Sequence, residues 1–95
     1  MAIRPHNPVI YYNLGNAYDK NESIANAITA YQKTIDIDPS YIDAYVNLGA
    51  LLAQQGRFEE AREIWRRGLK INHDELDIKR NLEKLDRLQK NNPAL

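Results

Sequence analysis

The sequence predicts an all-α solenoid of about five helices, and three observations lead to this fold class. The chain matches itself at an offset of 34 residues, apolar residues recur at helical spacing inside each unit, and capping residues mark the boundaries. The offset places Asn13-Leu14-Gly15 on Asn47-Leu48-Gly49, and the Asn-Leu pair returns at Asn81-Leu82. One such unit cannot bury both faces of its hairpin, so successive units are expected to stack.

The first two helices are expected at residues 8–20 and 24–37. Asn7 offers a capping side chain, and Pro8 follows at the first helical position, where proline is favoured. Apolar residues then keep a spacing of three and four through both segments, as one face of a helix requires. These signals predict a helical hairpin.

The third and fourth helices are expected at residues 42–54 and 58–71. Ser40 is expected to cap the third helix, with Asp43 three residues further on, and Ser23 also stands where a helix cap belongs. Gly56 follows the third helix, where a left-handed backbone conformation is favoured. The second unit therefore repeats the hairpin of the first.

A fifth helix is expected at residues 75–91, and it keeps only half of the repeat pattern. Its apolar positions repeat those of the third helix: Ile78, Leu82 and Leu85 stand in the places of Ala44, Leu48 and Leu51. The opposite face becomes polar: Lys79, Glu83 and Asp86 replace Tyr45, Gly49 and Leu52. Since a polar face does not receive a partner helix, this segment is expected to be a solubilising cap.

Small residues are expected where the helices of a hairpin approach each other. Gly15 is expected to face Ala27, and Gly49 to face Ala61, with large aromatic rings filling the space around these contacts. The three leucines of the repeated Asn-Leu pair, Leu14, Leu48 and Leu82, are expected to be buried at equivalent places in successive layers.

The repeat resembles the tetratricopeptide repeat (TPR) family. The matching residues are Tyr11, Leu14-Gly15, Tyr18, Ala27, Tyr31 and Pro39, then Tyr45, Leu48-Gly49, Leu52, Ala61 and Trp65. The resemblance implies a right-handed superhelical solenoid. It divides the chain into repeats at residues 8–41 and 42–74, the capping helix 75–91 and a tail at 92–95. One departure is the first hairpin turn, where Asn21-Glu22 replaces Gln55-Gly56, so that turn is expected to be looser.

Residues 1–7 allow two interpretations. Ile3 and Pro5 align with Ile37 and Pro39, which favours the end of a preceding repeat and hence a piece of a longer array. Alternatively, Met1 is a true start and the segment is a proline-rich lead-in. In the first case the apolar side of helix 8–20 has lost its natural cover.

Composition argues against several function classes. Thirteen basic residues balance thirteen acidic ones, so we expect neither nucleic acid nor a membrane surface as a partner. The chain has no cysteine, which agrees with a cytoplasmic location. Its two histidines, His6 and His73, fall in expected turns, and its glycines are scattered singly. We therefore expect a non-enzymatic protein without cofactor or metal.

The resemblance implies a concave groove that grips a peptide or helix of a partner protein. The groove residues expected by this resemblance are Tyr12, Asn13, Asn16, Asn47, Arg80, Asn81 and Lys84. The recurring asparagines carry both donors and acceptors, which suit a peptide backbone, although asparagine could simply be common at this place in the family. The alternative is self-association into a homo-oligomer, or a hairpin swap, through the uncovered first helix.

Some family members bind the C-terminal carboxylates of heat-shock chaperones with two asparagines and several cations. Asn16 and Asn47 match the two asparagines. Tyr12, Asp77 and Asn81 stand at the cationic places, and Asp77 would repel a carboxylate. Capture of a chaperone tail is therefore not expected here.

Overall fold

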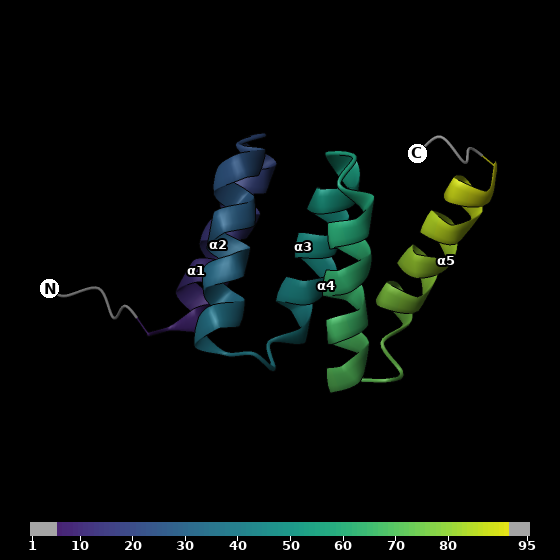
Figure 1. Ribbon diagram of the computed structural model, residues 1–95. Helices are drawn as coiled ribbons and strands as arrows, with labels where there is room; N and C mark the ends of the chain where they lie inside the picture. Colours follow the sequence, from purple (N-terminus) through teal and green to yellow (C-terminus); the bar gives the residue numbers. More distant parts are fainter. Residues whose placement is uncertain (1–5, 92–95) are drawn as a thin grey trace, which may run out of the picture.

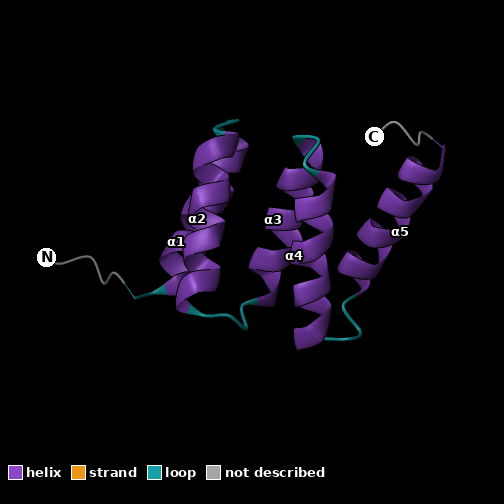
Figure 2. Ribbon diagram, in the orientation of Figure 1, coloured by secondary structure: helices purple, strands orange, loops and turns teal. Residues whose placement is uncertain are grey.

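The computed structural model describes residues 6–91 as five α-helices joined by short turns, with no strand in that range (Figures 1 and 2). The helices are α1 (Pro8–Lys20), α2 (Ile24–Ile37), α3 (Ile42–Gln54), α4 (Phe58–Ile71) and α5 (Leu76–Asn91). The predicted all-α class is confirmed, and the predicted helix ranges agree except that α5 begins one residue later. Residues 1–5 and 92–95, which include the aligned Ile3 and Pro5, lie outside the described range.

The helices follow one another across an elongated body of 52 × 29 × 16 Å. In Figure 1, α2 and α4 lie in front, and α1 and α3 lie behind them. The chain thus has two broad surfaces. We call the one formed by α1, α3 and α5 the first-helix face, and the one formed by α2 and α4 the second-helix face.

The helix ends follow local chemistry, with two exceptions. The side chain of Asn7 accepts a hydrogen bond of 3.0 Å from the backbone N–H of Val9, as predicted. The predicted cap at Ser40 is wrong: its hydroxyl and its backbone N–H both donate to Asp38 Oδ1, at 2.7 and 3.1 Å. Tyr41 takes the N-cap position of α3 without a side-chain hydrogen bond, and Ser23 makes none at the start of α2.

Aromatic rings lie against the two glycines inside the hairpins. A Cβ at Gly15 would lie 2.5 Å from the ring of Tyr31, and a Cβ at Gly49 would overlap the indole of Trp65. The three atoms nearest to each such Cβ thus belong to a ring from the second helix, and the predicted neighbours Ala27 and Ala61 are fully buried in the same core. Each glycine lets a large ring approach the backbone of the partner helix closely, and this fixes the spacing of each hairpin.

The core lies between the two hairpins and under α5. Leu48 is 1% exposed, whereas Leu14, at the equivalent position of α1, is 41% exposed. The predicted burial of Leu14 is therefore wrong, and Leu82 is only partly buried. The physical reason is position: α3 packs against α2, but within the described residues no helix packs on the corresponding side of α1.

Helix α5 packs against α4 near its N-terminal end and diverges from α4 toward its C-terminal end. Ile78 is fully buried, and its side chain lies against Gly68, where a Cβ would come within 2.5 Å of it. From there α5 leans away from α4 toward its own C-terminal end (Figure 1). The long side chain of Arg62 spans this opening and donates to Asp86 at 2.5 Å and to Gln89. The opening sets the shape of the first-helix face.

Candidate functional site

A polar cluster occupies the α1–α3 half of the first-helix face. Tyr31 donates a hydrogen bond of 2.5 Å to Asn16 Oδ1, so a residue of α2 reaches the side of α1. Asn47 Nδ2 lies 3.0 Å from the hydroxyl of Tyr12, 3.3 Å from Asn16 Oδ1 and 3.5 Å from the hydroxyl of Tyr31. We call these four residues the tyrosine–asparagine cluster. Most of their polar atoms are used within the protein, which stiffens this half of the face.

Aromatic rings surround the cluster. The ring of Tyr12 lies with its centroid 5.8 Å from that of Tyr31 and 5.1 Å from that of Tyr41. Burial raises the pKa of Tyr31, and the hydrogen bond with Asn47 opposes this only in part. Burial also raises the pKa of Tyr41, with the nearby Tyr12 and Asp43 adding to it. Both phenols are therefore neutral hydrogen-bonding groups at physiological pH.

An open apolar groove occupies the α3–α5 half of the same face, where α5 leans away. Its volume is about 430 Å³. Side chains of three helices line it: Ala50, Ala53, Gln54, Phe58, Trp65, Asn81, Lys84, Leu85 and Leu88. We call this space the apolar groove. Leu88 is 48% exposed at its rim, and Lys84 is the one charged residue among the lining side chains.

Two substitutions between the repeats explain why the halves differ. Trp65 stands where the first repeat has Tyr31, and its indole N–H donates to the backbone carbonyl of Val46 at 3.3 Å, so it presents no hydroxyl to the face. Ala50 stands where the first repeat has Asn16 and leaves only a methyl group. The change from Tyr and Asn to Trp and Ala turns a polar, closed position into an apolar, open one.

Cations gather on α5 beside the apolar groove. A shallow hollow on this helix is lined by Asp77, Arg80, Asn81, Glu83, Lys84 and Arg87. Arg80, Lys84 and Arg87 are spaced by four and three residues, so they are neighbours on one side of the helix. This side of α5 can attract an anionic group.

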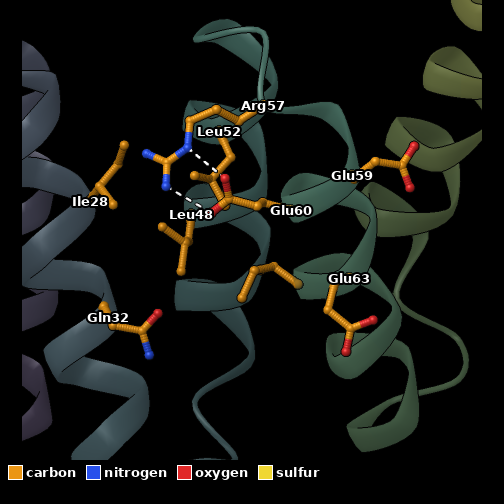
Figure 3. A pocket seen from close by; sticks show the side chains of 9 residues that line it. Ile28, Gln32, Leu48, Leu52, Arg57, Glu59, Glu60 and Glu63 are labelled. Atoms are coloured by element: carbon orange, nitrogen blue, oxygen red, sulfur yellow. Dashed lines mark hydrogen bonds and ion pairs between the residues drawn. The ribbon is translucent and has the colours of Figure 1, made fainter.

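A furrow on the second-helix face is the alternative site (Figure 3). Ile28 and Gln32 of α2 lie on one side of it, and Leu48 and Leu52 form its floor, where they are almost fully buried. At its rim, Arg57 and Glu60 pair at 2.7 Å, which lowers the pKa of Glu60 through that hydrogen bond. The groups best placed to meet a ligand here are therefore bound to each other.

The residues predicted from sequence fall into three groups. Tyr12, Asn16 and Asn47 come together in the cluster, and Asn81 and Lys84 line the apolar groove. The remaining two, Asn13 and Arg80, lie exposed on α1 and α5. Sequence reasoning missed the residues that the second helices and the turn contribute: Tyr31, Tyr41, Phe58 and Trp65. The alternation of Tyr31 and Trp65 at equivalent positions was the available signal.

Other kinds of site leave no trace in residues 6–91. No group of three or more histidine, aspartate and glutamate side chains is arranged there to hold a metal ion. No helix in that range is long and apolar enough to cross a membrane. Every buried side-chain nitrogen or oxygen of these residues has a hydrogen-bond partner.

The known proteins that resemble this chain include tetratricopeptide repeat proteins. A family described as TPR repeat matches residues 20–56, and one described as tetratricopeptide repeat matches residues 42–75. An uncharacterized protein of Methanocaldococcus jannaschii is 36% identical over 61 residues, which are 64% of this chain and 71% of that protein. Among solved structures, the first TPR of Spaghetti (RPAP3) bound to the HSP90 peptide SRMEEVD has a TM-score of 0.84. The two sequences are 26% identical, and the match covers 90% of this chain and 68% of the chain in that structure.

A longer relative shows the same repeat inside an enzyme. The mouse (Mus musculus) protein O-mannosyl-transferase TMTC1 is 35% identical over 94 residues, or 95% of this chain. The matched part is only 10% of that transferase, so the chain spans about a tenth of its length.

Proposed function

This chain belongs to the tetratricopeptide repeat family, and we propose that it is a protein-interaction module whose first-helix face binds a segment of a partner protein. The observation that carries the proposal is the pairing of a rigid polar cluster with an open apolar groove on one face. Such a surface suits a peptide, because backbone groups need polar partners while side chains need apolar pockets. The solved relative that holds a peptide, and that covers nine-tenths of this chain, adds support.

The two halves of the first-helix face would make different contacts with the partner segment. The first-helix face has Asn16 Nδ2 and Asn47 Oδ1 as polar atoms beyond those used in the cluster's hydrogen bonds. These atoms can pair with the backbone of an extended segment whatever its sequence. Specificity would then come from the side chains that enter the apolar groove.

The chaperone-tail peptide SRMEEVD is expected to bind weakly. Tyr12, which stands at a cationic place of such clamps, already accepts a hydrogen bond from Asn47. Asp77 lies exposed at a second cationic place. A terminal carboxylate would therefore meet a phenol and a carboxylate instead of two cations.

The proposal is tested by selecting short peptides from a random display library on the full chain and mapping one selected peptide by NMR. We expect backbone amide shifts to change around Asn16, Asn47 and Asn81. Asn47→Ala should weaken binding by about 1 kcal/mol per lost hydrogen bond, whereas the matched change Gln32→Ala on the second-helix face should leave it unchanged. Shifts concentrated around Ile28, Leu52 and Glu63 would move the site to the furrow of Figure 3 and end the proposal.

Self-association is the second candidate function, and the exposed side of α1 favours it. Val9 and Leu14 are 47% and 41% exposed, and Ile10 lies beside them on α1. A second copy could cover this side in a dimer. Sedimentation equilibrium over a wide concentration range decides the matter: a monomer at all concentrations excludes it, and a dimer abolished by Leu14→Glu supports it.

A further inference from the structure

We infer that the apolar groove is the anchor of the partner segment, and that it takes one large apolar side chain flanked by carboxylates. This inference rests on the proposed function. It assigns the strongest contact to the α3–α5 half of the first-helix face, and it states the chemistry of the partner: an acidic peptide with a single aromatic or leucine anchor.

Only the α3–α5 half of the first-helix face is open. In the tyrosine–asparagine cluster, the hydroxyl of Tyr31 and the amide of Asn47 fill the space between α1 and α3 with their own hydrogen bonds. An apolar side chain entering there would break these bonds without replacing them. The apolar groove carries no such network, because Trp65 turns its N–H to a backbone carbonyl.

The apolar groove has the size and the lining of a binding pocket. Its volume of about 430 Å³ lies within the range of pockets that hold whole ligands. Trp65 and Phe58 form its aromatic wall, and Leu85 and Leu88 of α5 face them. Leu88 stays 48% exposed although it lines the groove, so apolar surface remains there for a partner to bury.

The charges beside the apolar groove favour an acidic partner. On a helix, Lys84 has Arg80 and Asn81 as its neighbours before it, and Arg87 and Leu88 as its neighbours after it, and none of these is acidic. Two other charges of α5 are already paired, Asp86 with Arg62 and Lys79 with Asp74 at 3.8 Å. Asp77 and Glu83 line the same hollow as Arg80, Lys84 and Arg87, which leaves an excess of one positive charge there. Lys84 itself has a cation on either side of it along α5 and no acidic residue one turn away. A carboxylate from a partner would therefore relieve the repulsion at Lys84.

The lining of the groove and the cations beside it together favour one kind of occupant. A basic peptide would meet Arg80, Lys84 and Arg87, and a fully apolar one would leave their repulsion in place. An acidic segment with one large apolar side chain satisfies both the cations and the lining. Its apolar side chain would lie against Trp65, with its carboxylates toward α5.

Trp65 is the only tryptophan in the chain, so the tryptophan fluorescence comes from a residue that lines this groove. The probe is a short capped peptide in which one central phenylalanine lies between two pairs of glutamates. Added to the full chain, it should change the Trp65 emission along a saturable curve. Two control peptides, with alanine for phenylalanine or with lysines for glutamates, should bind at least about tenfold more weakly.

Variants assign the contacts without touching the core. Lys84→Gln should weaken binding of the acidic peptide by about tenfold, as expected for one charge-assisted hydrogen bond. The matched change Lys90→Gln, on the same helix but outside the groove lining, should leave the affinity within about twofold, as for an exposed charge outside the contact. Leu88→Ala should weaken binding through the apolar contact. Circular dichroism melting of each variant confirms that the fold is kept.

The outcomes separate the two proposals. If the lysine peptide binds as well as the glutamate peptide, or if Lys84→Gln has no effect, the inference is overturned. If library-selected peptides bind around Asn16 and Asn47 while the Trp65 emission stays constant, the inference fails and the proposed function stands. If no peptide shifts any amide of the first-helix face, both fail.

Discussion

The hydroxyl of Tyr31 connects the core of the first hairpin to the first-helix face. Its ring lies across Gly15 and is fully buried, while its oxygen donates to Asn16 and lies 3.5 Å from the amide of Asn47. A single side chain thus serves packing and the candidate site together. Changes to it should affect both stability and binding.

Ionisation of Tyr31 should make the free energy of unfolding fall as the pH rises in the alkaline range. Burial raises its pKa in the folded protein above the ordinary value of about 10, so the unfolded chain releases this proton first as the pH rises. The stabilising contribution is complete below about pH 10 and is lost as the pH rises through the raised pKa. We expect the urea concentration at the midpoint of unfolding to be lower at pH 11 than at pH 8.

Tyr31→Phe is the control for this effect. It should lower stability at pH 8 by about 1 kcal/mol through the lost hydrogen bond, and it should make the decline at alkaline pH shallower. Equal slopes for both proteins would show that Tyr31 does not carry the pH dependence. Any pH dependence that remains in Tyr31→Phe is attributed to Tyr41, because burial raises the pKa of Tyr41 as well.

At the residue scale, the types of the site residues could be predicted but their partners could not. The resemblance to the TPR family pointed to Asn16 and Asn47 as face positions, and both lie in the cluster. The 34-residue offset makes Asn13, Asn47 and Asn81 equivalent, yet only Asn47 of these three belongs to the cluster. The offset does not reveal that Tyr31 reaches across from α2, because that contact joins residues from different helices. It follows from the length of the Tyr31 side chain and the close approach that Gly15 allows.

The hairpins differ most in their turns. Gly56 closes α3 with a φ of 77°, a left-handed conformation that glycine adopts without cost. Glu22 takes the same region in the first turn with a φ of 61°. A residue with a Cβ is strained there by about 1–2 kcal/mol, so the first turn is the weaker one.

A matched pair of substitutions measures this strain. Glu22→Gly should stabilise the protein by about 0.5–1 kcal/mol, since relief of strain exceeds the added entropy of the unfolded chain. Gly56→Ala should destabilise it by about 1 kcal/mol, because a Cβ there meets no atom and only the backbone conformation opposes it. Thermal unfolding of both variants checks the pair; a destabilising Glu22→Gly would contradict it.

At the element scale, helix ranges were predictable because their signals are local. The spacing of apolar residues and the caps at Asn7 and Gly56 act within a few residues of chain. The prediction failed where a competing local contact was available, as at Ser40, whose hydroxyl bonds to Asp38. The tilt of α5 could not be predicted, because it depends on two contacts between distant residues, Gly68 with Ile78 and Arg62 with Asp86.

The whole molecule is a row of helices in which each layer is buried by its neighbour. Leu48 is covered because α2 packs against α3, and Ile78 is covered because α4 packs against α5. Leu14 has the same residue type and the same repeat position, yet it is exposed. Burial in such a row is a property of the neighbour as much as of the sequence.

Leu14 and Leu48 therefore form a natural matched pair at the scale of the whole molecule. Leu48→Ala should cost about 2–5 kcal/mol, because it leaves a cavity between α2 and α3. Leu14→Ala should cost less than about 1 kcal/mol, as for a surface substitution, since the removed atoms are already in contact with solvent. Urea unfolding at low protein concentration provides both values under conditions that disfavour association. If Leu14→Ala lowers the free energy of unfolding nearly as much as Leu48→Ala does, something covers α1 in solution. If that loss also grows with protein concentration, the cover is a second copy of the chain.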